Sequence, residues 1–394
     1  MGMRRTITAT AISAAVLLAV SCAKERGTST NEDARRYFEA WVAVQSKAHP
    51  EYMWEKAGSG IYILEDSQVE NGEVVTDKAY VMVEYTCTDL DGNVIGTSHE
   101  DLSHKTGINY DKSYYYGPAT WTNSDAALNV GVRDIISGMT IGGTRKAVVP
   151  SWLATSTRYA TEEEFIANVT DGSDYIYEIK IADATDDILN YQCDEMDRYW
   201  KQNIQGLDPD SDGAAENAPY TGPDGVQYQE CWDTSYTGFL FRQYFNTLET
   251  GEDGSPVMTF EKDSTILINY TGRRLDGQVF DTTIADTAKV HNIYNPAKTY
   301  APVEVKWSND STAITLGESG DLINGFKSML KHLHNEEAGT DNEGKPVEGF
   351  SAGETATAIF YSSLGYGYSG SGSAIPGYAP LRFDITVVKE EEEE

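Results

Sequence analysis

The sequence has little positive charge, and it lacks C-x-x-C and P-loop motifs. Its 30 Lys and Arg residues stand against 62 Asp and Glu residues, which gives a net charge of −32. Such an excess of negative charge repels phosphate backbones, so sequence-independent nucleic-acid binding is excluded. No C-x-x-C motif and no G-x-x-x-x-G-K-S/T phosphate-binding loop occurs, so neither motif indicates a class of chemistry.

What the sequence does contain indicates a folded protein rich in β-structure. At roughly 100–200 residues per domain, 394 residues predict two or three domains. The hydrophobic fraction of 40% and the aromatic fraction of 11% are sufficient for packed cores. The 35 Gly and 25 Tyr residues favour a turn-rich, β-leaning chain.

The N-terminus has the pattern of an export signal. Two arginines precede the apolar run 9–20, which is too short for a stable membrane span but fits a secretory signal peptide over residues 1–21. The run ends in AVSC (19–22), which resembles the lipobox of bacterial lipoproteins, with Ala at a position where Leu is commoner. The resemblance implies lipidation of Cys22; ordinary signal cleavage with an incidental Cys22 is the alternative.

A lipidated Cys22 would hold the protein on a membrane, because each buried CH₂ of an acyl chain contributes about 0.8 kcal/mol. Residues 22–30 are then a polar tether. The expected location is the bacterial cell envelope, and Ala23 in place of Asp favours the outer membrane by family analogy. The sequence leaves open whether the protein faces the periplasm or the medium.

Three cysteines remain after Cys22. Cys87 lies in an alternating strand pattern and is expected to pack as a small hydrophobic residue. Export places the chain in an oxidising compartment, where Cys193 and Cys231 could form a disulfide, although the sequence does not determine the pairing.

The chain repeats itself once. The periodicity of residues 31–45 and 194–204 predicts two helices that share an Arg-Tyr-aromatic sequence. Each is followed by an extended segment and then by a strand, an Asp-Gly turn and a returning strand, VMVEYTCTDLDGNVI (81–95) and ILINYTGRRLDGQVF (266–280). We therefore predict two homologous domains over 31–187 and 262–389, with a linker helix and extended segment over 188–261 and an acidic tail over 390–394.

The second half predicts an α+β domain. Strands are expected at 264–271, 277–282, 312–316, 354–361 and 380–388, and a helix at 320–332. A curled antiparallel sheet wrapped over one short helix leaves a pocket between them. Residues 284–311 are an insertion that could cover the pocket, and residues 335–351 form a polar loop that could extend its rim.

Residues 262–389 resemble the FKBP class of peptidyl-prolyl isomerases. Seven motifs stand in the order and approximate spacing of that family: NYTG (269–272), DGQVFD (276–281), LGES (316–319), DLINGF (321–326), LGYG (364–367), AIP (374–376) and LRFDITVV (381–388). By position, the resemblance implies catalytic roles for Tyr270, Phe280, Asp281, Ile323, Phe326, Tyr366 and Phe383, and substrate-binding roles for Leu322 and Ile375. Two positions depart from the family: Phe326 replaces the usual Trp, and about Thr312 replaces a further pocket aromatic, which leaves one wall more open.

Residues 79–187 resemble the same fold in degenerate form. Tyr85 and Tyr177 keep aromatic positions of the first and closing strands, whereas the Phe-Asp pair has become Ile95-Gly96 and the floor aromatic falls on Val132. No counterpart of the LGYG tyrosine is recognisable. We expect this domain to be non-catalytic.

The residues of the second half suit rotation about an X-Pro amide, which must cross a barrier of about 18–20 kcal/mol. The twisted amide is less polar than the planar one, so a dry aromatic cavity favours it relative to the planar form. By the resemblance, the Tyr366 hydroxyl and the Ile323 N–H would bind substrate carbonyls, and Ile323 and Ile375 would hold the proline ring. Asp281 would orient Tyr270 or interact with the rotating carbonyl. No cofactor or metal is required, and the expected partners are proline-containing polypeptides and the membrane.

Other interpretations stay open. The same fold could serve a non-catalytic envelope lipoprotein that binds peptides, a partner protein or glycan, and the aromatic segment 110–121 could contact a glycan or simply close the edge of its domain. Residues 208–216 have part of a calcium-loop spacing, but Pro219 stands where a bidentate Glu is required, so an acidic turn is favoured. His332 and His334 diverge on a helix and do not indicate a metal site.

Overall fold

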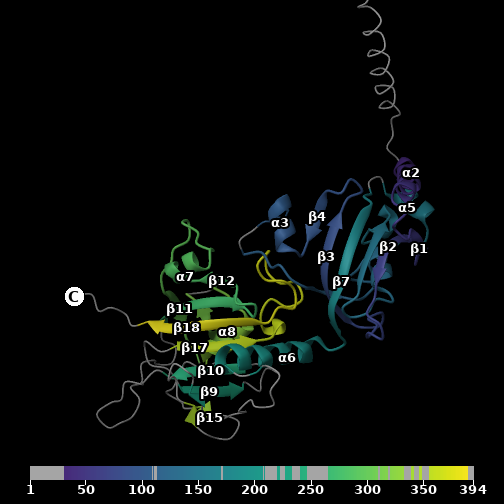
Figure 1. The fold of residues 1–394 in the computed structure, drawn as a ribbon. Helices are drawn as coiled ribbons and strands as arrows, with labels where there is room; N and C mark the ends of the chain where they lie inside the picture. The colour runs from purple at the N-terminus through teal and green to yellow at the C-terminus, as the bar shows by residue number, and fades with distance from the viewer. Residues whose placement is uncertain are drawn as a thin grey trace, which may run out of the picture. The chain divides into compact units, whose positions relative to one another are not determined.

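The computed structural model describes two antiparallel sheets with their helices (Figure 1). The described residues are 31–108, 110, 113–169, 172–206, 208, 220–221, 227–232, 240–245, 265–308, 311–317, 320–331, 339–340, 346–347 and 355–388. The predicted signal peptide, Cys22, the tether, most of the calcium-loop segment, His332, His334 and the acidic tail lie outside them.

The first sheet has seven strands in the order β1-β2-β6-β7-β3-β4, and β5 pairs with β3. Its strands are β1 (Glu55–Ala57), β2 (Ile61–Ser67), β3 (Tyr80–Thr88), β4 (Val94–Thr97), β5 (Ala119–Thr122), β6 (Thr144–Val149) and β7 (Tyr175–Thr185). The accompanying helices are α2 (Asn31–Ala48), α3 (Glu100–Thr106), α4 (Val130–Ile136) and α5 (Glu162–Asn168), with a 3₁₀ turn at Ser151–Leu153.

The second sheet has nine strands in the order β14-β13-β11-β18-β17-β10-β9-β8, and β12 pairs with β11. Its strands are β8 (Tyr220–Thr221), β9 (Gln227–Trp232), β10 (Leu240–Phe245), β11 (Thr265–Arg274), β12 (Val279–Thr282), β13 (Val303–Lys306), β14 (Thr315–Leu316), β17 (Thr355–Phe360) and β18 (Leu381–Val388). The helices are α6 (Ile188–Trp200), continued by a π turn over Lys201–Gln205, α7 (Ala285–Val290) and α8 (Asn324–Lys331); 3₁₀ turns lie at Ser311–Ala313 and Ser362–Leu364, and β15 (Gly339–Thr340) and β16 (Pro346–Val347) form a separate pair.

The two sheets share one topology. In the first, the path β1-β2-β6-β7-β3 carries β4 and β5 on β3; in the second, β9-β10-β17-β18-β11 carries β12 and β13 on β11. In each half one helix stands before the sheet and one short helix (α4 or α8) precedes the strand next to the closing strand. The predicted α+β class and the internal repeat are confirmed.

Most predicted elements of the second half are present, with local differences. Residues 284–311 are more than a loop, because they include α7 and a strand, β13, that pairs with β11. The strand expected at 312–316 is reduced to β14, since Ser311–Ala313 form a 3₁₀ turn. The helix expected at 194–204 begins earlier, at Ile188, where the Asp187 side chain accepts hydrogen bonds from the N–H groups of the first turn.

The core of the second half lies between the sheet and α8. Phe326, Met329 and Leu330 of α8 are buried against Ile268 of β11 and Phe383 of β18, among other apolar residues. Trp307 follows β13, is fully buried, and donates a hydrogen bond of 2.8 Å from Nε1 to the Leu330 carbonyl. This bond ties α8 to the edge of the sheet.

The chain divides into two compact units. The first combines residues up to Thr76 with Cys87–Ile95 and Ser124–Ile179; the second combines Asp77–Thr86 and Gly96–Asn123 with the chain from Lys180 onward. The predicted domain limits follow the sequence repeat and stay a prediction. A helix able to cross a membrane is not found in the part of the chain that the structure describes.

Candidate active site

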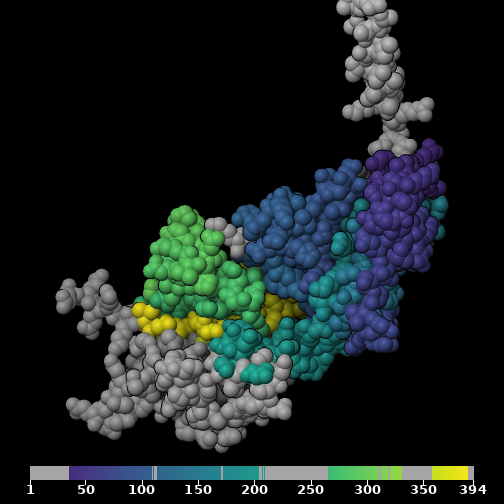
Figure 2. Space-filling model, in the orientation of Figure 1, coloured from purple at the N-terminus to yellow at the C-terminus, as the bar shows by residue number. Residues whose placement is uncertain are grey.

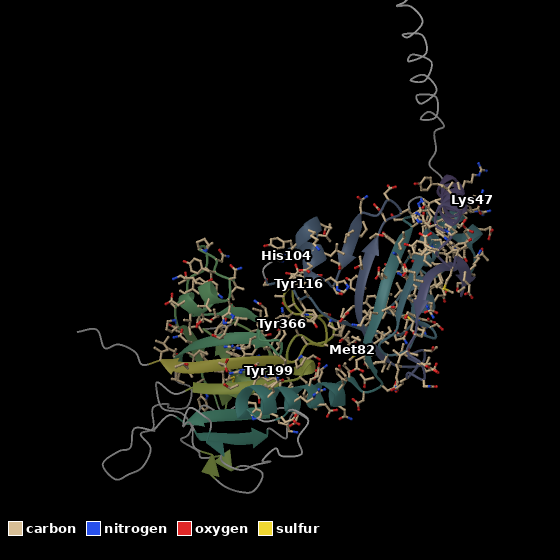
Figure 3. The ribbon with its side chains drawn as sticks, viewed as in Figure 1. Lys47, Met82, His104, Tyr116, Tyr199 and Tyr366 are labelled. Atoms are coloured by element: carbon tan, nitrogen blue, oxygen red, sulfur yellow. The ribbon has the colours of Figure 1, made fainter. Side chains whose placement is uncertain are left out.

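A cavity of about 430 Å³ opens where β11, β12 and β18 meet the N-terminus of α8. Tyr366, labelled in Figure 3, forms part of the cavity wall and lies in the segment that follows the 3₁₀ turn at Ser362–Leu364. The lining residues are Tyr270, Phe280, Asp281, Leu316, Asp321, Leu322, Ile323, Asn324, Phe326, Gly365, Tyr366 and Phe383. Eight of the nine pocket residues implied by the sequence resemblance therefore line one cavity.

The cavity has an aromatic floor centred on Phe383. Its ring centroid lies 5.0 Å from that of Phe326, 5.7 Å from that of Phe280 and 6.3 Å from that of Tyr270. The Phe326 and Phe280 rings meet it edge to face, an arrangement that aromatic quadrupoles favour. Phe326 and Phe383 are almost fully buried, so this floor belongs both to the core and to the cavity.

Gly272 on β11 permits this arrangement of rings. A Cβ atom at this position would lie 2.7 Å from ring atoms of both Phe280 and Phe383, closer than real Cβ contacts allow. The β11–β12 register also shifts between Gly272 and Arg273. The glycine of the NYTG motif thus allows two rings to lie against the backbone.

Asp281 joins three groups at the edge of the cavity. Its carboxylate accepts a hydrogen bond of 2.7 Å from the Tyr270 hydroxyl and one of 2.8 Å from the Thr282 N–H, and it forms an ion pair with Lys298. Burial, followed by the Asp281 charge, raises the pKa of Tyr270, so its hydroxyl stays protonated and donates to the carboxylate. The position of Asp281 agrees with the predicted role of orienting Tyr270.

Tyr366 is held by helix α6. Gln192 of α6 is fully buried; its Nε2 donates a 3.1 Å hydrogen bond to Ser362 Oγ, and its Oε1 accepts a 2.8 Å bond from the Ser362 N–H. The Ser362 carbonyl in turn accepts hydrogen bonds from the N–H groups of Gly365 and Gly367, on either side of Tyr366. Burial, and secondarily Asp281, raises the pKa of Tyr366, so its hydroxyl is available as a donor at neutral pH.

One predicted residue lies elsewhere and several lining residues were not predicted. Ile375 is buried in the core instead of lining the cavity, because its segment folds back in a bridge between Ser371 and Ile375. The unpredicted lining residues are Leu316, Asp321, Asn324 and Gly365, which lie within or beside the LGES, DLINGF and LGYG motifs. Leu316 supplies an apolar wall near the place where an aromatic was expected, while Thr312 is exposed in the 3₁₀ turn.

The insertion between β12 and β13 leaves the cavity uncovered by its described residues. None of residues 284–308 is among the lining residues, and Lys298 reaches the cavity edge only through Asp281. In Figure 2 the green surface that includes α7 projects beyond the yellow surface of the C-terminal strands. The rings of Tyr294 and Tyr300, both in the insertion, stack with their centroids 5.1 Å apart.

The matching positions of the first half are occupied differently. Val132 of α4 is buried where Phe326 lies in the second half, and Ile95 at the Phe280 position is 49% exposed. Tyr85 packs instead on Trp121 of β5, with ring centroids 5.4 Å apart. Loss of the Phe-Asp pair removes both the ring and the carboxylate that define the edge of the second-half cavity.

The described aromatic residues of segment 110–121 pack on one another, on α3 and on other parts of the chain, such as Arg274, which lies 5.0 Å from the Tyr115 ring centroid. Tyr114 and Tyr116 lie 4.9 Å apart, and His104 of α3 meets Tyr110 at 4.7 Å and Tyr116 at 6.3 Å. A hydrogen bond of 2.9 Å joins the hydroxyls of Ser103 and Tyr116. These contacts favour the packing interpretation of this segment.

The structure describes the side chains of two cysteines, Cys87 and Cys193. Cys87 is buried and Cys193 is half-buried, and both are free thiols. Burial raises the pKa of both thiols, so they are poor nucleophiles at neutral pH. The side chain of Cys231 lies outside the described residues.

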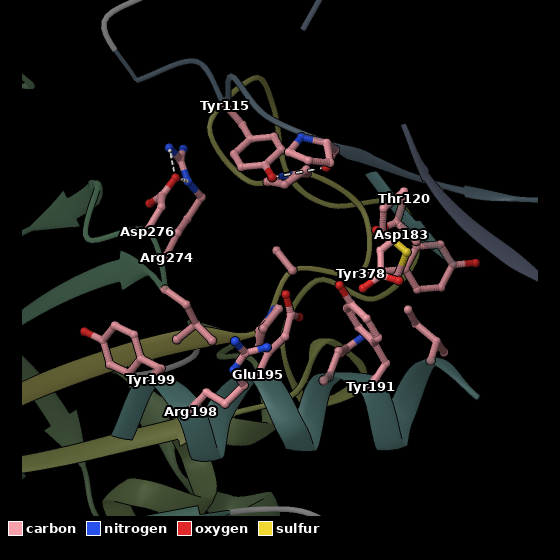
Figure 4. Close-up of a pocket in the computed structure, with 18 of the residues that line it drawn as sticks. Tyr115, Thr120, Asp183, Tyr191, Glu195, Arg198, Tyr199, Arg274, Asp276 and Tyr378 are labelled. Carbon is pink, nitrogen blue, oxygen red and sulfur yellow. Dashed lines mark hydrogen bonds and ion pairs between the residues drawn. The ribbon is translucent and has the colours of Figure 1, made fainter. Parts of the chain in front are cut away.

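The second unit contains another cavity, of about 570 Å³, along one side of α6 (Figure 4). Its lining includes Tyr191, Glu195 and Arg198 of α6, together with Asp183 and Arg274. Burial and the nearby Asp183 charge raise the pKa of Glu195 to about 7. None of the residues implied by the family resemblance lies in this cavity, and no group of three or more metal-ligating side chains is found among the described residues.

Residues 258–388 match the family of FKBP-type peptidyl-prolyl cis-trans isomerases. The chain therefore carries a C-terminal FKBP-type domain, and the cavity lies within the matched segment. No curated protein matches the chain.

Several solved structures are similar to the chain. The three FKBP domains of wheat FKBP73 align at 14% identity over 83% of this chain and 92% of theirs, with a TM-score of 0.23. FkpA from Escherichia coli aligns at 17% identity over 45% of this chain and 70% of its own, with a TM-score of 0.26. A peptidyl-prolyl cis-trans isomerase from Pseudomonas syringae pv. tomato aligns at 16% identity over 51% and 92%, with a TM-score of 0.23.

Proposed function

We propose that the C-terminal domain isomerises X-Pro bonds of polypeptides in the aromatic cavity. The observation that carries this proposal is that eight residues implied by the FKBP resemblance, distant in sequence, line one cavity of about 430 Å³. A substrate amide on the floor of Phe326 and Phe383, beside the Phe280 wall, would lose water, and loss of water destabilises the charge-separated planar amide more than the twisted one. Neither a metal nor a covalent intermediate is needed for this rotation.

The polar groups of the cavity support the same role. The neutral Tyr366 hydroxyl can donate to a substrate carbonyl at the cavity wall. Ile323 immediately precedes α8, at a helix terminus where backbone N–H groups lack intrahelical acceptors. Asp281 holds Tyr270 at 2.7 Å, which keeps the aromatic wall in place while a substrate enters.

A proline-peptide isomerisation assay on residues 23–394 tests the proposal. Wild-type protein is expected to accelerate the cis-to-trans change, and the double variant Tyr366→Phe, Phe280→Ala is expected to lose most of that acceleration. Equal rates at the uncatalysed level for both proteins would defeat the enzymatic proposal. Peptide binding without turnover would support the alternative, a non-catalytic binding lipoprotein.

We further propose that the protein is a folding factor of the bacterial cell envelope, with proline-containing polypeptides as partners, and is held on the outer membrane through lipidated Cys22. The N-terminal sequence supports this location, and the net charge of −32 speaks against nucleic-acid partners. Metabolic labelling with a palmitate analogue is expected to mark the wild-type protein and not Cys22→Ser. Equal labelling, or soluble fractionation of both, would contradict the anchor.

A further inference from the structure

We propose that Lys298 is a specificity-determining residue that lets the cavity accept prolines flanked by acidic side chains. This inference rests on the proposed isomerase function and concerns its substrate class. The observation behind it is the ion pair between Lys298, which comes from the insertion between β12 and β13, and Asp281, which lines the cavity.

The charges around the cavity are balanced by lysines that do not line it. Among the lining side chains that the structure describes, only Asp281 and Asp321 are charged, and both are carboxylates. Lys298 pairs with Asp281, and Lys327 pairs with Asp321 at 2.7 Å. Without these lysines, two carboxylates at the mouth of the cavity would repel an acidic peptide, in a chain whose net charge is already −32.

The two lysines differ in how far a substrate can reach them. The Lys298 side chain is 37% exposed, whereas that of Lys327 is 17% exposed. An ammonium group has three donors, so Lys298 can keep its bond to Asp281 and still offer a donor to an incoming carboxylate. Lys298 is therefore the cation that a substrate side chain at this edge would meet.

The insertion holds Lys298 in position. The Lys298 N–H donates to the Asn295 carbonyl at 3.0 Å, and the Asn295 N–H donates to the Tyr300 hydroxyl at 2.9 Å. The Lys298 ammonium lies 5.6 Å from the centroid of the Tyr300 ring, which in turn stacks on Tyr294. A turn, a cation–π contact and a ring stack thus place one charge against the cavity edge.

The test measures peptide preference. Two series of tetrapeptides, with Glu, Leu or Lys directly before or directly after the proline, give kcat/KM ratios for acidic over basic peptides. For Lys298→Gln we expect this ratio to fall about two- to fivefold, the effect of losing one partly exposed charge contact. Lys298→Glu should lower the ratio further, and Lys298→Arg should preserve it. Adding 0.5 M salt should shrink the differences between variants, because the Debye length falls from about 10 Å at 0.1 M to about 3 Å at 1 M and exposed charges are then screened.

Lys289→Gln is the matched control. Lys289 lies in the same insertion, on α7, pairs with Asp286 at 2.9 Å, and also faces an aromatic ring, that of Tyr294. It carries the same charge as Lys298, so a general change in protein charge would appear equally in both variants. We expect Lys289→Gln to leave the peptide ratio unchanged.

The outcomes separate this inference from the proposed function. Turnover with the same peptide ratio in wild type and Lys298→Gln would overturn the role of Lys298 and leave the isomerase intact. If no peptide is turned over, the isomerase proposal fails, and calorimetric binding of the same peptides takes the place of kcat/KM. An unchanged binding ratio, or no binding by any peptide, would then overturn the inference, while a loss confined to acidic peptides supports it.

Discussion

The single variants Phe383→Leu and Phe280→Leu should separate the contribution of the aromatic cluster to stability from its contribution to isomerisation. Phe383 is 5% exposed and contacts four rings: those of Tyr270, Phe280 and Phe326, and that of Phe360, which stacks on it at 5.8 Å. At about 0.5 kcal/mol for each ring pair, the lower end of the usual range, these contacts contribute roughly 2 kcal/mol beyond simple burial. We therefore expect Phe383→Leu to lower the free energy of unfolding by roughly 2 kcal/mol or more.

Phe280 is half-buried at the cavity wall and faces the Phe383 ring at 5.7 Å. Phe280→Leu should cost less than about 1 kcal/mol of stability, because a single, partly exposed ring contact is lost. Both variants should slow isomerisation, since both remove aromatic surface from the cavity.

Urea unfolding followed by tryptophan fluorescence, with the isomerisation assay run on the same preparations, measures both effects. The fully buried Trp307 reports on the same core. Equal losses of stability in the two variants would refute the distinction between core floor and cavity wall. A Phe280→Leu protein with full activity would refute the catalytic role assigned to that wall.

Two further predictions follow from the packing of the second unit. Gly272→Ala should lower the melting temperature and slow isomerisation, because its Cβ would lie 2.7 Å from ring atoms of Phe280 and Phe383; unchanged melting and activity would contradict this. Glu195→Gln should melt higher than wild type at pH 8 and at the same temperature at pH 4. The pKa of Glu195 rises from 4.5 to about 7 on folding, so the native state holds an extra proton between these values and stability falls as pH rises through that window. A variant that melts lower than wild type at pH 8 would contradict the pKa assignment.

The sequence predicted the parts of the site that depend on local pattern. Strands β11, β12, β17 and β18 follow from alternating apolar residues and the Asp-Gly turn at 276–277, and each begins and ends within three residues of its prediction. The eight predicted residues that line the cavity came from ordered motifs, whose spacing carries information about a whole domain that no single residue carries.

The parts that were missed depend on contacts that leave no periodic signal in the sequence. Strand β13 has only four residues, and its pairing with β11 is what makes it a strand. Ile375 could not be separated from the cavity residues by sequence, because a local bridge with Ser371 decides which way its segment folds. The Lys298–Asp281 pair spans 17 residues and joins two partly exposed side chains, and such pairs leave no periodic signal in a sequence.

Helix α6, in the predicted linker between the two repeats, packs into the core of the C-terminal half. Sequence motifs begin near residue 262 and the family match near 258, yet α6 supplies buried groups that the cavity requires. Met196 and Trp200 of α6 belong to the same apolar core as Phe326 and Phe383. Gln192 satisfies both the N–H and the hydroxyl of Ser362, the residue whose carbonyl fixes the backbone on either side of Tyr366.

A domain that began at the first motif would therefore expose part of its apolar core. It would also leave the N–H of Ser362, a residue that is only 4% exposed, without its acceptor on Gln192. Such a polar group costs about 1–3 kcal/mol when it is buried and unsatisfied, and it lies four residues before the tyrosine that lines the cavity wall. The helix between the repeats is thus part of the structure that positions the candidate active site.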